Sequence, residues 1–172
     1  LTVTDADVSN TVTMSVTGVS IDTTQTTPGV QTLLGSTSPL LNSAQLLSML
    51  TVTNGTNGSW PADPTAGSSF TWSFDSSKVT DNANNTFDFL AKDEKLVLKY
   101  TLTATDSNNS VNTTPRTVQI TITGTNDVPV ITQVGTDSDS AILAEANQTL
   151  STSGTLTVTD ADVSNTVTMS VT

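Results

Sequence analysis

Acidic side chains are the residues of this chain best suited to chemistry, and they gather in short groups at the ends of alternating apolar and polar runs. The groups are Asp5 and Asp7, Asp93 and Glu94, Asp106, Asn126 and Asp127, Asp137 and Asp139, Glu145, and Asp160 and Asp162. Carboxylates that are brought together repel one another unless a cation lies between them. Calcium is the expected cation, because it takes about six to eight oxygen ligands from Asp, Asn and backbone carbonyls.

The alternative is that these acids are solvated turn residues on an acidic, soluble surface. For a single Asp in a Thr-rich loop that alternative is the better interpretation. For the whole set, the order of the motifs along the chain, described below, favours a shared cation.

Composition excludes several other kinds of site. The chain has no His and no Cys, which removes zinc sites, thiolate chemistry, disulfides and His-based triads. Its formal net charge of −11, from 16 acids and 5 bases, repels a nucleic acid backbone and favours cations. No apolar run approaches the roughly 18 residues of a membrane helix, so no membrane partner is expected.

Alternating side chains indicate the elements that must position the acids. Thr fills 37 of the 172 positions and usually alternates with Val, Ile or Leu. This period of two is typical of half-buried strands. The clearest runs are 1–5, 11–17, 70–74, 95–106 and 117–124. Because turn signals separate the runs, the sequence predicts an antiparallel sandwich of about seven short strands.

Two segments depart from the alternation. Within 39–50, apolar residues follow helical spacing after an Asn-Ser cap signal, which predicts a short helix over one end or edge of the sandwich. Residues 87–94 are a candidate for a single helical turn that leads into the strand at 95. The rest of 22–69 is expected to be an irregular insertion with a small apolar cluster of its own.

A long repeat is the other strong feature of the sequence. Residues 1–17 recur letter for letter at 156–172, so identical copies lie 155 residues apart. This spacing indicates a tandem array of domain-sized repeats, because solenoid repeats are far shorter. The chain is therefore expected to be a slice of a longer protein. Such copying suits a spacer or a multivalent surface better than an enzyme, since reach and valency grow with copy number.

Several motifs occur in a characteristic order along the chain. They are Thr4-Asp5-Ala6-Asp7 after a strand, Glu94 before a strand, Thr105-Asp106 at its end, and GTNDVPV at 124–130. This order resembles a cadherin-like domain. From Phe70 to Val130 the chain more narrowly resembles the VCBS repeats of giant bacterial surface adhesins of the RTX type, through Trp72-Ser73-Phe74, Phe87-Asp88-Phe89-Leu90 and 100–106. The resemblance covers most of the period except 22–69. It implies an all-β fold, a cadherin-like or immunoglobulin-like antiparallel Greek-key β-sandwich with a short helical insertion.

The resemblance also implies a set of calcium ligands, because calcium fills the junctions between successive domains in cadherin-like arrays. The ligands of one junction would be Asp93 and Glu94 from the base of a domain, Asn126 and Asp127 from the linker, and Asp160 and Asp162 from the next domain. Asp5, Asp7 and Asp106 would serve the preceding junction, and Glu145 the following one. The base departs from the family's acid-Arg-acid pattern, because Lys92 and Lys95 flank its two acids. The linker also lacks one acid of the fullest form, which allows fewer ions per junction.

The same resemblance implies how the chain is divided. Residues 1–123 would be the body of one cadherin-like repeat lacking its first strands, 124–130 a calcium-binding linker, and 131–172 the opening strands of the next repeat. The linker spans at most about 23 Å, too little for the opening strands to fold back onto the body. We therefore expect residues 128 to about 155 of one molecule to complete a neighbour by strand addition, in head-to-tail chains.

The expected function is that of a calcium-rigidified extender, a stalk repeat of a bacterial cell-surface or biofilm adhesin that projects a distal adhesive tip. The resemblance implies a secreted or surface location, with neighbouring repeats of the same protein as partners. An alternative is a glycan-binding or homophilic adhesion module that uses Trp60 and Trp72 to stack on sugars. Trp72, however, alternates with Phe70 and Phe74 and is expected in the core.

No enzyme activity is expected. Without His, a hydrolase would need a carboxylate pair or a Ser-Lys arrangement. Asp75, Asp81 and Asp88 are too scattered for the first, and Lys78 after Ser76-Ser77 is expected to be a solvated turn residue.

Overall fold

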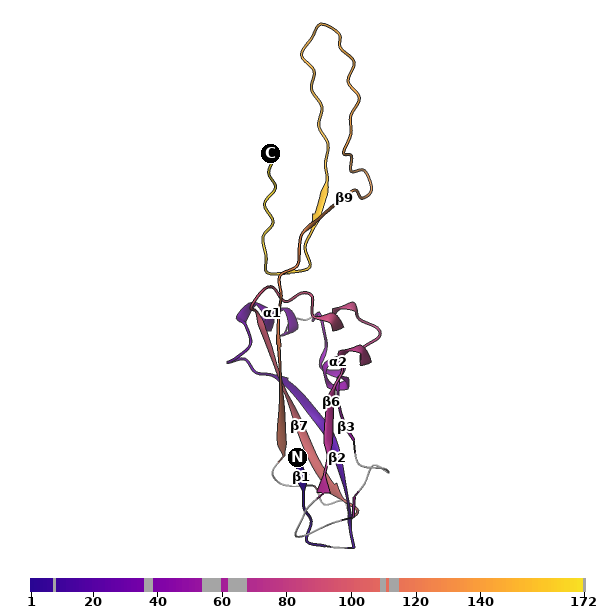
Figure 1. Cartoon of the computed structure of the whole chain (residues 1–172), viewed down its shortest axis with the longest axis vertical. Coiled ribbons are helices and arrows are strands. Elements are labelled where there is room, and N and C mark those ends of the chain that lie inside the picture. Colours follow the sequence, from indigo (N-terminus) through magenta and orange to yellow (C-terminus); the bar gives the residue numbers. More distant parts are fainter. Residues whose placement is uncertain are drawn as a thin grey trace.

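The computed structural model describes residues 1–7, 9–35, 39–53, 60–61, 68–108, 111 and 115–171, with the backbone alone at 60, 61 and 68. These residues form an elongated body, residues 1–123, and a projecting segment, residues 128–171, which leaves one end of the body (Figure 1). In the structure a shorter stretch, residues 124–127, joins the two parts, and from here on we call this stretch the linker.

A four-stranded antiparallel sheet forms the main layer of the body. Its order is β4 (Trp60–Pro61), β2 (Thr11–Ile21), β7 (Lys95–Asp106) and β8 (Arg116–Thr123). The long strands β2 and β7 lie at the centre and pair along most of their lengths, as β7 and β8 also do. The runs that alternate Thr with apolar residues are therefore strands, as predicted.

Shorter strand pairs pack against this sheet. β3 (Leu50–Thr53) pairs with β6 (Thr71–Phe74), and β1 (Thr2–Val3) pairs with β5 (Ser68–Ser69), both antiparallel. The described residues thus form mainly antiparallel sheets with few helices, which confirms the all-β prediction.

The segment 22–69 contains two helices and the strands β3, β4 and β5. α2 (Ser43–Ser48) confirms the predicted helix, and a capping box joins Asn42 and Gln45 through hydrogen bonds of 2.9 and 3.0 Å. α1 (Pro28–Gly35) and the three strands were not predicted, so the expectation that the rest of this segment is irregular was wrong there. α1 forms because Pro suits the first helical position and Val30 and Leu34, four residues apart, are both buried.

The helical turn expected at 87–94 lies earlier in the chain. Two short 3-10 helices, η2 (Ser76–Lys78) and η3 (Ala83–Thr86), precede this segment, and 87–94 contains turns instead. Phe87 and Asp93 have left-handed backbone, with φ of 63° and 66°, which a right-handed helix does not admit. Among the helices that the structure describes, none has the length and apolar character needed to span a membrane.

The core of the body is centred on Tyr100 in β7. Leu96, Leu98 and Leu102 are buried beside it on the same strand. The Tyr100 hydroxyl donates a hydrogen bond of 2.8 Å to the Leu46 carbonyl of α2, and burial raises the pKa of this hydroxyl. The ring of Phe74 in β6 meets Tyr100 edge-on at 6.3 Å between centroids. One side chain of β7 therefore contacts both α2 and the β3–β6 pair.

A shielded ion pair fastens the segment after β2 to the main sheet. The carboxylate of Asp22 accepts from Lys99 Nζ at 2.7 Å and from the Thr24 N–H at 2.9 Å. Lys99 and Thr24 hold the pKa of Asp22 well below its usual range, because both stabilise the charged form.

The projecting segment is extended, and its one strand pair joins β9 (Val130–Thr132) to β10 (Thr157–Thr159). Residues 166–171 form no strand, although they repeat the sequence of residues 11–16 in β2. Met14 in β2 is 6% exposed, whereas its copy Met169 is 55% exposed. This sequence therefore becomes a buried strand only where β7 pairs with it.

Gly124 connects β8 to the linker at a place where no side chain fits. Its N–H donates to the Glu94 carbonyl at 2.9 Å, and its own carbonyl accepts from the Asp93 N–H at 3.2 Å. A Cβ on Gly124 would lie 2.2 Å from the Leu90 carbonyl oxygen and 2.3 Å from that of Ala91. The two carbonyl oxygens belong to the backbone and cannot turn away as a flexible side chain could. The close approach of the 90–91 backbone therefore requires glycine at position 124, the first residue of GTNDVP.

Gly124→Ala is expected to lower the free energy of unfolding by about 1–3 kcal/mol, since the methyl group must push the linker away from the 90–91 backbone. Urea denaturation measures the change. Gly29→Ala in α1 is the matched control, because nothing lies within 4 Å of a Cβ there. Gly124→Ala protein as stable as the unmodified chain would contradict the close approach.

Candidate metal centre

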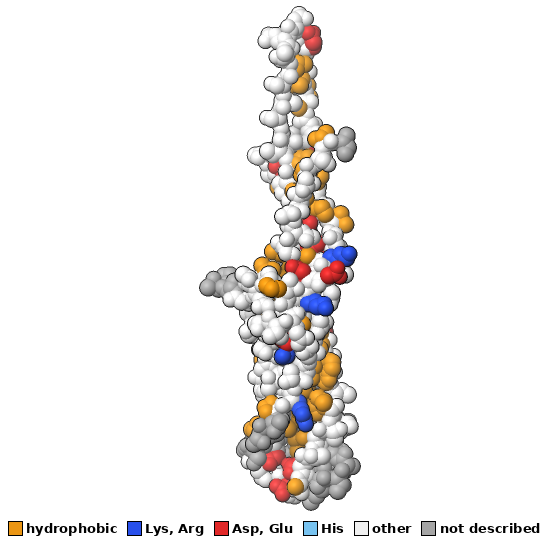
Figure 2. Space-filling view, turned by 90° about the vertical axis from the view of Figure 1, so that its left-hand side faces the viewer, with side chains coloured by type: hydrophobic (Ala, Val, Ile, Leu, Met, Phe, Trp, Pro, Cys, Tyr) orange, Lys and Arg blue, Asp and Glu red, His pale blue; other side chains and the backbone are white. Residues whose placement is uncertain are grey.

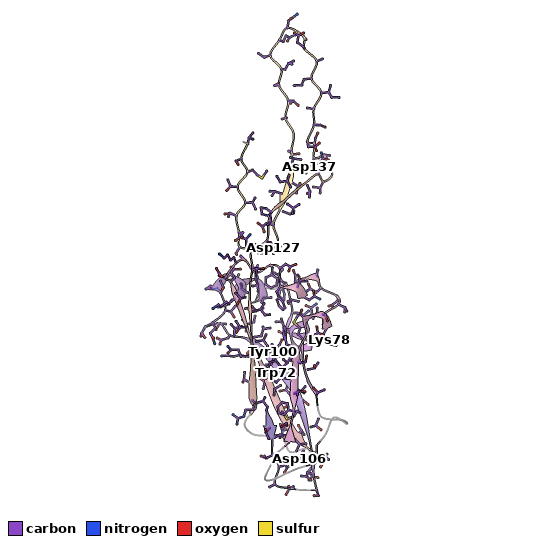
Figure 3. All side chains as sticks on the ribbon, in the orientation of Figure 1. Trp72, Lys78, Tyr100, Asp106, Asp127 and Asp137 are labelled. Carbon is purple, nitrogen blue, oxygen red and sulfur yellow. The ribbon has the colours of Figure 1, made fainter. Side chains whose placement is uncertain are left out.

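Four carboxylates from three parts of the chain meet where the projecting segment leaves the body. Asp88 lies in the body after η3, Asp127 ends the linker, and Asp160 and Asp162 follow β10. The negative charges of the other three all act on Asp127. Figure 3 shows Asp127 at this end of the body. We call these four residues the junction cluster.

Hydrogen bonds hold the loop after β10 against both the linker and the body. The Asp127 N–H donates to Asp162 Oδ2 at 3.0 Å, and the Val163 N–H donates to the Phe89 carbonyl at 3.4 Å. Within the loop, the Asp162 N–H donates to Asp160 Oδ1 at 3.0 Å. The loop at 160–165 is therefore docked at the linker end of the body.

The carboxylate of Asp162 is buried but only half satisfied. The residue is 2% exposed. Its Oδ2 accepts from the Asp127 N–H and from Asn165 Nδ2 at 2.9 Å, whereas its buried Oδ1 has no hydrogen-bond partner among the described residues. A buried carboxylate oxygen without a partner is costly, because it has lost its water. The other side chains of the junction cluster are carboxylates, which cannot donate a hydrogen bond to Oδ1 when they are charged. A bound cation would satisfy this oxygen.

The first copy of the repeated sequence is an internal control for this site. Its loop forms the same turn, with the Asp7 N–H donating to Asp5 Oδ1 at 2.9 Å and the Asn10 N–H donating to the Asp7 carbonyl at 2.8 Å. Asp7 is nevertheless exposed, whereas its copy Asp162 is buried. The turn is thus a property of the sequence, and the burial of Asp162 comes from docking.

Like charges oppose this docking. Loss of solvent, followed by the charges of Asp162, Asp88 and Asp160, raises the pKa of Asp127 above its ordinary 3.8. Figure 2 shows acidic side chains at the level where the projecting segment meets the body. A bound cation would reverse the sign of these interactions.

The residues present fit a hard cation. Beside the junction cluster lies a cavity of about 120 Å³, lined by Asp88, Asp127, Thr86, Thr125 and the 122–124 strand end. These groups offer carboxylate, hydroxyl and carbonyl oxygens, which are the ligands of calcium. Among the residues that the structure describes, no three acidic side chains are placed so that they could hold a metal ion together. A cation bound here would require the carboxylates to move closer together.

The structure places the predicted ligands of this junction in two different roles. Asp127, Asp160 and Asp162 belong to the junction cluster. Asp93 and Glu94 hold the linker through their backbones, and the Glu94 carboxylate accepts from the Ala91 N–H at 3.0 Å. Asn126 donates from its side chain to the Asp127 carbonyl.

The acids predicted for other junctions lie elsewhere. The strand register places Asp106 opposite Val12 at the far end of β7 from the linker, as Figure 3 shows, and Asp106 Oδ1 accepts from the Asn108 N–H at 2.8 Å. The loop of Asp5 and Asp7 reaches this end through Asn10, whose Oδ1 accepts from Asn108 Nδ2 at 3.2 Å. In the projecting segment, Glu145 Oε1 accepts from the Asn147 N–H at 2.6 Å.

Asp88 is the functional candidate that sequence reasoning missed. It stands between Phe87 and Phe89, which are buried, while Asp88 itself is exposed. Buried aromatics on both sides fix such a residue in place. That flanking pattern was the available signal, but the partners of Asp88 lie about 40 to 75 positions away in the sequence.

The residues of the alternative functions are placed as follows. The prediction that Trp72 lies in the core was wrong, because its side chain is 42% exposed. β6 pairs with β3 on one edge and with no described strand on the other, so the ring is not covered from that side. The side chain of Trp60 lies outside the described residues. Asp75 caps η2 by accepting from the Ser77 N–H, and Lys78 lies 3.9 Å from its carboxylate.

Comparison with known proteins identifies no relative, since no protein-family model, curated protein or solved structure matches the chain. The likeness to VCBS and cadherin-like repeats therefore rests on the motifs of this chain.

With a chelator present, the junction is expected to become more stable as the pH falls. The raised pKa of Asp127 means that the folded chain takes up a proton more readily than the unfolded chain. The stabilisation is therefore gained as the pH falls through this pKa, which lies above 3.8, and is lost as the pH rises above it. Hydrogen exchange of the Asp127 amide over a pH series from 4 to 7, corrected for intrinsic rates, measures the change.

The Thr24 amide is the control for this experiment. This amide donates to Asp22, whose pKa is lowered in the folded chain. The stabilisation that the charged Asp22 contributes is therefore constant above pH 3.8 and is lost only below it. Protection of the Asp127 amide that stays constant over the whole series, or that weakens toward pH 4, would show that the carboxylates do not oppose docking.

Proposed function

We propose that this chain is a calcium-rigidified extender, a stalk repeat in which a cation fixes the direction of one domain relative to the next. One observation supports this most strongly: Asp162 is buried with an unpartnered Oδ1 among other carboxylates, whereas its copy Asp7 is exposed. Burying the Asp162 carboxylate without a partner for Oδ1 is unfavourable, and a cation shared by the carboxylates would compensate for it.

The ligands would come from every part that must be held together. Asp88 belongs to the body, Asp127 to the linker, and Asp160 and Asp162 to the segment that follows β10. Calcium would supply positive charge and attract all four carboxylates, while the Asp127 and Val163 hydrogen bonds orient the loop. Binding to the docked form alone would shift the equilibrium from a flexible linker to a fixed one.

The proposal includes the fold type of the body, a Greek-key β-sandwich. An antiparallel Greek-key β-sandwich of the VCBS or cadherin-like type agrees with the strand pairs of the body and with the turn shared by Asp5-Ala6-Asp7 and Asp160-Ala161-Asp162. A stalk on a bacterial surface would lie in calcium-rich medium, where sites of about millimolar affinity suffice. The net charge of −11 would keep neighbouring stalks apart.

Asp162→Asn is expected to weaken calcium binding at least about tenfold, roughly 1.4 kcal/mol, because it removes one charge from the centre of the cluster. Isothermal titration of calcium into the chain measures the affinity. Asp7→Asn is the matched control, since it alters the identical motif at the exposed copy and should leave this affinity unchanged. Equal affinities for the two variants, or no calcium binding by the unmodified chain, would refute the proposal.

A further inference from the structure

Among the described residues, no strand pairs with the second edge of the short strand β1, which lies beside an apolar groove. The Leu1 carbonyl accepts from the Phe70 N–H at 3.0 Å, so Leu1 and Val3 direct their backbone groups toward β5. Thr2 directs its backbone groups the other way, where no described strand pairs with β1. The groove along β1 has a volume of about 340 Å³, and its apolar walls include Met14, Phe70, Leu102 and Ala104.

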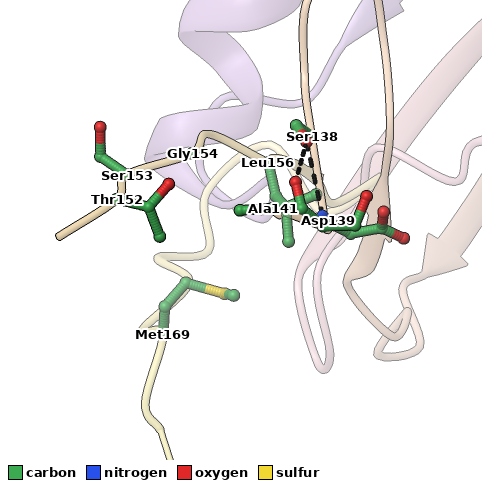
Figure 4. Close-up of a pocket in the computed structure, with 9 residues that line it drawn as sticks. Ser138, Asp139, Ala141, Thr152, Ser153, Gly154, Leu156 and Met169 are labelled. Carbon is green, nitrogen blue, oxygen red and sulfur yellow. Dashed lines mark hydrogen bonds between the residues drawn. The ribbon is translucent and has the colours of Figure 1, made fainter. Parts of the chain in front are cut away.

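The second copy of the repeated sequence indicates what fits this edge. β10 has the sequence Thr-Val-Thr, which recurs at residues 2–4, where Thr2 and Val3 form β1. β9 pairs with β10 in the register Thr157↔Thr132, Val158↔Ile131 and Thr159↔Val130. Leu156 and Met169, the copies of two groove residues, line an open hollow of about 570 Å³ (Figure 4). The other walls of that hollow come from 138–141 and 152–154. Leu156 and Met169 thus share their hollow with residues of the projecting segment, whereas Leu1 and Met14 line the groove along β1 together with residues of the body.

The β9 strand of the same molecule cannot fill its own groove while the junction is docked. Asp127 is held at the linker end of the body, and three residues from Asp127 to Val130 span at most about 10 Å. The groove lies beside Leu102 and Ala104, seven and nine residues along β7 from Lys95 at the linker end. At about 3.3 Å per residue this separation is about 23 to 30 Å.

We propose that β9 of one molecule pairs with the open edge of β1 in a second copy, in the register Thr2↔Thr132, Val3↔Ile131 and Thr4↔Val130. Each molecule offers one open β1 edge and one β9, so the contact is heterologous and builds head-to-tail chains. The proposal does not depend on calcium, although a docked junction directs β9 away from its own body.

Exchange of β9 from β10 to β1 conserves most polar contacts. β1 and β10 offer identical backbones and side chains, and the Thr157 Oγ1 that donates to Asp137 Oδ2 at 2.6 Å has its copy in Thr2. The difference lies in apolar burial. Ile131 is 53% exposed in the projecting segment. Opposite Val3, which packs against the core, it would face the groove.

Single cysteines test the proposed register, because the chain contains no Cys. Val3 and Ile131 would form a non-hydrogen-bonded pair, the closer kind, whose Cβ atoms suit a disulfide. Val3→Cys protein mixed with a size-tagged Ile131→Cys protein under mild oxidation is expected to give a crosslinked heterodimer on a non-reducing gel. Tagged Val130→Cys protein is the matched control, since adjacent side chains on a strand point to opposite faces. Crosslinking of Ile131→Cys no stronger than that of Val130→Cys would overturn the proposal.

Light scattering over a concentration series tests the assembly without crosslinks. The average mass is expected to rise above that of a monomer, with Ile131→Ser reducing the rise at least several-fold and Val130→Ser leaving it intact. A strictly monomeric chain at high concentration would overturn the proposal, with or without calcium.

Discussion

A buried carboxylate oxygen among other carboxylates determines how the projecting segment is held. Asp162 loses its water when the 160–165 loop docks, and only one of its two oxygens gains hydrogen bonds. The negative charges of Asp162, Asp88 and Asp160 repel the carboxylate of Asp127. Apart from these charges, the loop is held to the linker and the body by two backbone hydrogen bonds, which the Asp127 and Val163 N–H groups donate. In the function that we propose, a cation neutralises these charges and thereby fixes the direction of the segment.

Strand pairing is the second constraint, because a β-sequence is completed only by its neighbours. The repeated 17 residues show this within one chain. Paired with β7, the first copy buries Met14 in the core, and the second copy leaves Met169 exposed. The turn around Asp5 and Asp160 forms in both copies, since its hydrogen bonds are local. Local hydrogen bonding thus fixes the turn, whereas partners determine burial.

The same distinction explains what could be predicted from sequence. Alternation identified β7 and β8, and the Asn42 cap identified α2, because those signals are local. α1 was missed, as its two buried residues sit in a short helix that contains Gly29. Trp72 was assigned to the wrong environment, because alternation gives the face of a strand but not whether a neighbouring strand covers it. Asp88 was overlooked as a ligand, since only folding brings it to Asp127, Asp160 and Asp162.

Whether calcium fixes the projecting segment relative to the body can be measured from the distribution of distances between a label on each part. Thr117 on β8 and Thr159 on β10 are exposed, and without native Cys both can be replaced by Cys and spin-labelled. Pulsed electron paramagnetic resonance, with excess unlabelled protein to suppress intermolecular signals, gives the distribution of distances between the two labels. If calcium fixes the junction, the distribution is narrow in calcium and broadens in chelator at pH 7. A distribution of the same width in both conditions would contradict our account.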